Sequence, residues 1–156
     1  MMNVLYDKSH WKEYLLYGSL SGVLYIIPSL IFLAIGDYNN TYILFLGSII
    51  FMFVIMSYTY KLSRRRTEYK NVWTRIVAAH ITVLTGIVVS VLLTLLLCFI
   101  FIPGFLSGHS IPMLKDAPEA YNIHNTGTVL MLFVCATVEN FGVGGSMAIV
   151  GAYLFK

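Results

Sequence analysis

The sequence has 156 residues, of which 58% are hydrophobic and only 11% are charged. A soluble domain usually carries about 25% charged residues, so this composition excludes an ordinary soluble domain. Several apolar stretches of about 20 residues, each long enough to cross a bilayer, are typical of a multi-pass membrane protein. The formal net charge of +3 is informative only through its distribution along the chain.

Four apolar segments are predicted to cross a membrane as helices, over residues 14–35, 42–60, 76–102 and 127–155. The first is longer than the roughly 7–15-residue core of a signal peptide, so we expect it to be retained as a span. A polar turn at residues 36–40 joins the first two spans, and Pro103 ends the third. The sequence therefore predicts an all-α fold, in which residues 1–156 form one membrane domain of four helices in an antiparallel bundle.

Nine of the ten Lys and Arg residues fall in segments on one side of this predicted bundle. Two precede the first span, six lie in the loop 61–75 and one ends the chain, whereas the loop 103–125 holds one. Cytoplasmic loops of membrane proteins carry such an excess of basic residues. We therefore expect both termini and the basic loop 61–75 in the cytoplasm, and a location in a bacterial inner (cytoplasmic) membrane.

The cluster Arg64, Arg65 and Arg66 within this loop is interpreted first as the determinant of orientation. It would also attract anionic lipid head groups, at about 1 kcal/mol per basic residue. So short a loop at a membrane surface is not expected to bind nucleic acid, although a cytoplasmic protein could dock on it. Membrane lipid is the partner that this cluster predicts.

Small residues repeat at intervals of about four along three of the predicted spans. In lipid, small residues let helix backbones approach one another, so such stripes mark helix interfaces. We favour packing within the bundle, and a homodimer or a larger membrane complex is the alternative. The second span has mainly Gly47 and Ser48, so we expect it to face lipid most. The stripes contain Gly18 and Gly22; Ala78, Thr82, Gly86 and Ser90; and Gly144, Ala148 and Ala152.

Glu139 and Asn140 lie about halfway along the fourth span. A charge at the centre of a membrane helix costs roughly 2.5–3.5 kcal/mol on insertion scales, so neighbouring helices are expected to shelter Glu139. One hypothesis makes Glu139 a proton or cation site, because burial favours the neutral form of a carboxyl group and so permits proton exchange. The favoured hypothesis is a structural role, with Glu139 protonated or bonded to Asn140, to Tyr25 or to a hydroxyl of the third span.

Other polar residues do not form a recognisable catalytic or metal-binding pattern. Cys98 and Cys135 lie in apolar stretches and are expected to be free thiols. His80 is expected to be a satisfied polar group of the third span. The outer loop contains His109, Asp116, Glu119 and His124, whose spacing matches no metal-binding motif. The sequence therefore predicts no catalytic residue, no cofactor and no metal site.

The pairs Trp11-Lys12 and Tyr17-Gly18 open the first span, and Phe141-Gly142 opens a glycine-rich half of the last span. Together with the charged loop after the second span, this arrangement resembles a family of small bacterial four-span membrane proteins known only as a domain of unknown function. The chain departs from that pattern in its short, proline-marked outer loop and in Glu139-Asn140. Because the family has no assigned activity, the resemblance implies a fold and no functional residue.

The sequence thus favours a non-enzymatic integral membrane protein that acts as a structural or accessory component. Its expected partners are membrane lipid and either a second copy of the chain or a larger membrane complex. The alternative function is a small proton- or cation-coupled transporter that uses Glu139.

Overall fold

The computed structural model describes residues 8–65, 69, 71–102, 105, 114–119 and 127–155. Four long helical segments form this part of the chain, and each is long and apolar enough to cross a membrane. The fourth segment is continuous but consists of three parts, because a π-helix, η3, interrupts it. The segments are α1 (Lys8–Ile35), α2 (Tyr42–Arg64), α3 (Val72–Phe101), and the series α5 (Gly127–Val134), η3 (Cys135–Glu139) and α6 (Asn140–Leu154).

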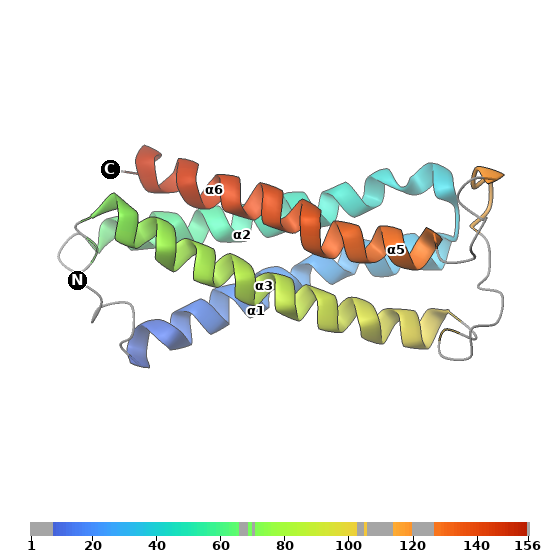
Figure 1. Cartoon of the computed structure of the whole chain (residues 1–156), viewed down its shortest axis with the longest axis horizontal. Helices are drawn as coiled ribbons and strands as arrows, with labels where there is room; N and C mark the ends of the chain where they lie inside the picture. The colour runs from blue at the N-terminus through green and yellow to red at the C-terminus, as the bar shows by residue number, and fades with distance from the viewer. Residues whose placement is uncertain are drawn as a thin grey trace.

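The four helical segments run alternately in opposite directions (Figure 1). The start of α1, the end of α2, the start of α3 and the end of α6 lie at one end of the bundle, here called the basic end. The other end, here called the far end, holds the end of α1, the start of α2, the end of α3 and the start of α5. Helix α1 packs against α2 and α3, and α6 packs against the same two helices. The predicted all-α, antiparallel four-helix bundle is confirmed.

The helices at the basic end extend beyond the predicted apolar spans. Helix α1 begins at Lys8, α2 continues to Arg64 and α3 begins at Val72. The side chain of Asn71 accepts a hydrogen bond from the backbone N–H of Trp73 at 3.1 Å, which caps the start of α3. Hydropathy predicts where a helix contacts lipid, whereas capping groups mark where its backbone hydrogen bonding ends. The helices therefore continue past the ends of the apolar stretches.

Close backbone contact joins α1 to α3. A Cβ atom added at Gly18 would lie 2.7 Å from the Cβ of Thr85, and one added at Gly22 would lie 2.7 Å from the carbonyl oxygen of Gly86. Real Cβ atoms do not approach other atoms so closely, so this interface requires glycine. All nine small residues of the three stripes named above are buried.

The expectation that the second span faces lipid most is wrong. Helix α2 buries 33% of its most apolar stretch, as α3 does, and the last helical segment buries the least, 28%. The reason is the bulk of Phe51 on α2, whose ring fills space left by glycines on two neighbouring helices. A Cβ added at Gly86 or Gly144 would lie 2.7 or 2.8 Å from that ring. The large side chain of Phe51 is therefore accommodated by glycines on the neighbouring helices.

The far end is fastened by a short backbone bridge between two connections. The N–H of Tyr38 donates to the carbonyl of Lys115 at 2.9 Å, and the N–H of Lys115 donates to the carbonyl of Gly36, also at 2.9 Å. Gly36 has φ +66°, a conformation that glycine adopts at little cost at the end of a helix. The 3-10 turn η2 (Tyr38–Asn40) then leads into α2, with Asp37 accepting a hydrogen bond from the N–H of Asn39.

Candidate functional site

The π-helix η3 ends at Glu139, and Glu139 and Asn140 lie in different environments. The N–H of Asn140 bonds to the carbonyl of Cys135, five residues earlier, instead of the usual four. Single turns of this kind are rare and occur often at functional sites. Asn140 is fully buried at 0% exposure, whereas Glu139 is only partly buried. The predicted polar pair is therefore split between the interior of the bundle and its edge.

Glu139 lies where the interior meets the outer surface. Its side chain lies near the thiol of Cys135, four residues earlier in the same helical segment. On the outer side its neighbours are exposed: Val138 is 66% exposed, and Gly142 one turn later is also exposed. The carboxyl group can thus interact both with the bundle interior and with a molecule outside it.

The interior side chain of Asn140 belongs to a group of buried polar atoms. Its Nδ2 donates to the carbonyl of Ala136 at 3.3 Å, so its Oδ1 atom is left facing the interior. Within the described ranges, Oδ1 has no hydrogen-bond partner, and the same holds for the hydroxyls of Tyr25, Ser48 and Ser90. Each of these four side chains comes from a different helix, and each is at most 1% exposed. Asn140, Tyr25 and a hydroxyl of the third span were considered as partners of Glu139, whereas the contribution of Ser48 on α2 was not predicted.

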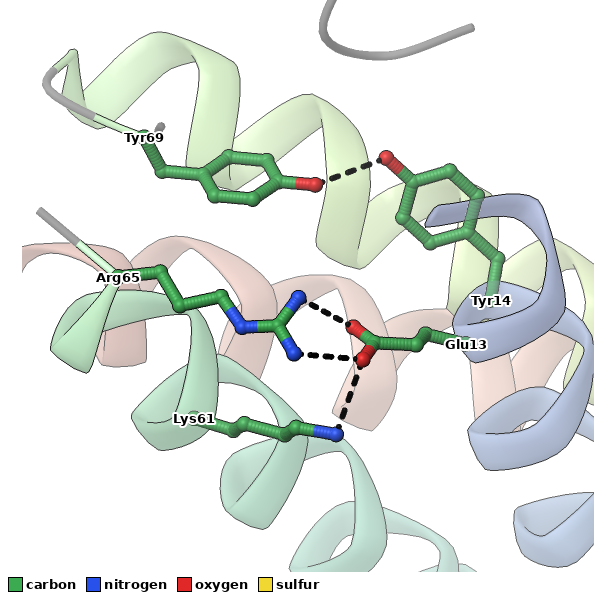
Figure 2. Close-up of polar contacts among 5 residues, drawn as sticks. All are labelled: Glu13, Tyr14, Lys61, Arg65 and Tyr69. Atoms are coloured by element: carbon green, nitrogen blue, oxygen red, sulfur yellow. Dashed lines mark hydrogen bonds and ion pairs between the residues drawn. The ribbon is translucent and has the colours of Figure 1, made fainter. Parts of the chain in front are cut away.

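An ion-pair cluster lies at the basic end (Figure 2). The carboxylate of Glu13, on α1, accepts hydrogen bonds from both terminal nitrogens of Arg65, at 3.1 and 2.7 Å, and from Lys61 at 3.1 Å. Two parallel bonds between arginine and a carboxylate combine charge attraction with fixed geometry. No role was predicted for Glu13, although an acid directly before the first span and facing the basic loop is a recognisable signal.

Aromatic side chains cover this ion-pair cluster on its inner side. The hydroxyls of Tyr14 and Tyr69 lie 3.2 Å apart and share a hydrogen bond, as Figure 2 shows. Tyr69 is 1% exposed, and burial away from water raises the pKa of its phenol, so it stays neutral at physiological pH. The ring of His10 lies edge-on to Tyr69, with ring centres 5.3 Å apart. These contacts join the start of α1 to the connection between α2 and α3.

The three arginines of the predicted cluster do not share one environment. Arg65 binds Glu13, whereas Arg64 is exposed and lies over the ring of Tyr60, 4.8 Å from its centre. Arg66 lies outside the described residues. Arg75, which is 7% exposed, donates to the carbonyl of Phe155 at 3.1 Å and so ties the end of α6 to the start of α3. Of the described arginines, Arg64 is thus the one best placed to meet lipid head groups.

The remaining candidate residues do not assemble into a metal or catalytic centre in the part of the chain that the structure describes. Cys98 and Cys135 are free thiols. The Nδ1 atom of His80 bonds to the carbonyl of Ile76 at 2.8 Å, within its own helix. His109 and His124 lie outside the described residues. Within those residues, no three His, Cys, Asp or Glu side chains come together in a way that could hold a metal ion.

Comparison with known proteins adds no assignment. No family model matches the chain, and neither a curated protein nor a solved structure does. The four apolar helices are compatible with the membrane-protein family that the sequence resembles. Membership of that family and a bacterial origin stay predictions.

Proposed function

We propose that the protein is a non-enzymatic component of a bacterial inner membrane, with both termini in the cytoplasm, and that it works by pairing through the outer face of its last helix. The position of Glu139 carries this proposal. Glu139 is partly exposed near the middle of the span, where acyl chains offer no hydrogen bond. A neighbouring protein helix would satisfy that group at less cost than lipid.

The outer face of α6 also has the shape of a helix-packing surface. Gly142 and Ser146 are four residues apart and both exposed. A Cβ atom added at Gly142 would meet nothing within 4 Å, whereas Gly144, Ala148 and Ala152 are all buried inside the bundle. Helix α6 therefore carries two stripes of small residues, of which the bundle uses one. Small residues four apart are the usual means by which membrane helices pack closely.

A second copy of the same chain is the partner to which we commit. Two copies related by a two-fold axis would bring the same face of α6 together, so that Gly142 of each copy permits close approach of the other. The two Glu139 carboxyl groups would lie at or near this contact, where one proton can be shared between them. A membrane helix of a larger complex is the other possible partner.

The test is the oligomeric state of the protein extracted in a mild detergent and measured by light scattering. We expect a dimer, and we expect Gly142→Ile to weaken it by roughly tenfold or more, because the added side chain would separate the two helices. The matched variant Phe141→Leu changes an exposed apolar residue next to the stripe and should leave the dimer unchanged. A monomer with no co-purifying membrane partner would contradict the proposal.

A proton- or cation-coupled transporter is the second candidate, and one observation favours it. Glu139 directly precedes Asn140, which is one of the four buried polar side chains described above. If the protein moves protons, vesicles that contain it should show proton flux, and Glu139→Gln should abolish that flux while leaving the fold intact. The absence of flux in vesicles that contain the unmodified protein would count against transport and would leave the pairing proposal standing.

A further inference from the structure

Contacts around one phenylalanine define a cross-section of the bundle. A Cβ atom added at Gly86 of α3 would touch both the ring of Phe51 on α2 and the hydroxyl of Ser21 on α1. A Cβ atom added at Gly144 of α6 would lie 2.8 Å from the same ring. Ser21, Phe51, Gly86 and Gly144 therefore lie at one level, with one residue from each helix.

A second level lies one helical turn, about 6 Å, nearer the far end, and each helix has a buried position there. Because α1 and α3 run towards the far end and α2 and α6 run away from it, these positions are Tyr25, Ser48, Ser90 and Asn140. Direct contact supports this register, since a Cβ atom added at Gly47, next to Ser48, would lie 3.0 Å from the ring of Tyr25. The four buried polar side chains thus form a single layer, which we call the polar layer.

Hydroxyl groups in the polar layer differ from those elsewhere in the helices. Buried serine and threonine hydroxyls in membrane helices commonly donate to a carbonyl of their own helix, three or four residues earlier. Ser21, Thr59 and Thr82 do so here, at 2.7 to 3.1 Å. Ser48 and Ser90 lack any such bond in the described part of the chain. The oxygen atoms of Ser48 and Ser90 therefore make no hydrogen bond within the described part of the protein.

Unpartnered side-chain oxygens are concentrated in and next to this layer. Among the described residues, six buried side-chain oxygens have no hydrogen-bond partner. Four form the polar layer, and a fifth, in Thr94, lies one turn beyond Ser90 on the same face of α3. The sixth belongs to Tyr58 at the basic end. Buried polar groups without partners are uncommon in native proteins and indicate a bound water or ion.

We propose that the polar layer binds a monovalent cation of the hardness of sodium. Its inward atoms are oxygens, which are the ligands that hard cations prefer. The Oδ1 atom of Asn140 is purely an acceptor, and a hydroxyl can bind a cation through its oxygen while donating its hydrogen elsewhere. Glu139 directly precedes Asn140, so the sequence brings one acid close to the layer, which disfavours an anion. With one acid rather than several, the site suits a monovalent better than a divalent ion.

This site lies inside one copy of the bundle, so it does not depend on the pairing proposed for the outer face of α6. The experiment uses the full chain, purified in detergent, and compares thermal unfolding in sodium, potassium, lithium and choline chlorides at equal ionic strength. Binding to the folded state alone should raise Tm by about 5 °C at a saturating sodium concentration relative to choline. The double variant Ser48→Ala, Ser90→Ala should lose this rise.

The control is Ser21→Ala, which removes a buried hydroxyl from the neighbouring level and should keep the full sodium effect. The double variant is expected to fold, because alanine removes two hydroxyls that have no hydrogen-bond partner among the described residues. A sodium effect that is the same in the double variant would place the site elsewhere and overturn the proposal. No effect of any alkali cation on the unmodified chain would also overturn it and would leave water as the content of the layer.

Discussion

The basic end and the polar layer both place polar side chains between helices, but they differ in how many of those side chains have partners. At the basic end, the Glu13 carboxylate has two cationic partners, Lys61 and Arg65, and Arg75 bonds to the last turn of α6. In the polar layer, each helix contributes one buried polar side chain. Within the described residues, none of the four oxygen atoms has a hydrogen-bond partner. The basic end lies where charges can be hydrated, whereas the layer lies among apolar groups.

This contrast indicates which part of the bundle is structural and which part is available for function. At the basic end, Glu13 is bonded by two cations and Tyr14 by Tyr69, so these contacts hold α1, α2 and the following connection in place, although the Tyr58 hydroxyl and Arg75 Nε lack partners among the described residues. An unsatisfied polar atom in a low-dielectric interior costs more than one near water, so the polar layer would not be expected in a purely structural bundle. The difference can be tested by substitutions that act on one region and leave the other unchanged.

The largest expected effect comes from filling the space beside the polar layer. In Gly86→Leu, the new side chain would collide with Phe51 and Ser21, so we expect the bundle to lose about 3 kcal/mol or more of stability, or to fail to fold. The matched variant Gly142→Leu adds the same side chain on the outer face of α6, where the space is open, and should leave unfolding of the monomer unchanged. Thermal unfolding in detergent measures both, and equal destabilisation would contradict the interior packing described here.

A smaller effect is expected at the basic end. Glu13→Gln keeps the size of the side chain but removes its charge, so it should lower stability by about 1 kcal/mol, since the ion pairs are only partly buried. Raising the salt concentration to about 1 M should lower the stability of the unmodified protein towards that of the variant, because salt screens exposed charges. Chemical unfolding with urea at low and high salt measures this. A salt response that is the same in the variant would show that other charges dominate.

Much of the architecture could be predicted from the sequence because lipid imposes a simple rule. Apolar length identified the four helices, and the placement of Lys and Arg residues matches the grouping of connections at the basic end. The stripes containing Gly18, Gly22 and Gly144 lie inside the bundle because close approach of helices requires small residues. The spacing of small residues did not predict the burial of α2, because the fit of Phe51 against two glycines depends on residues far apart in the sequence.

The candidate site was less predictable, for two physical reasons. First, the π-helix that precedes Asn140 has no marker in residue type, so the wider turn itself could not be predicted. Asn140 lies four residues before Gly144 on the buried face of α6, so regular helical spacing does account for its interior position and for the edge position of Glu139. Second, Ser48 and Ser90 become significant only as members of one layer, and the register between helices is set by packing contacts rather than by local sequence.

The smallest expected effect is the most informative about the polar layer. In choline chloride, Ser90→Ala removes a buried hydroxyl that has no partner among the described residues, so stability should change by less than about 0.5 kcal/mol or should rise. Ser21→Ala removes a hydroxyl of equal burial that donates to the carbonyl of Gly18 at 2.7 Å, and it should cost about 1 kcal/mol. The two variants delete the same atom one level apart, so their difference in unfolding free energy isolates the missing partner. If Ser90→Ala destabilises the bundle as much as Ser21→Ala does in choline, the Ser90 hydroxyl already has a partner, and the polar layer is a closed structural network instead of a site left open for a cation.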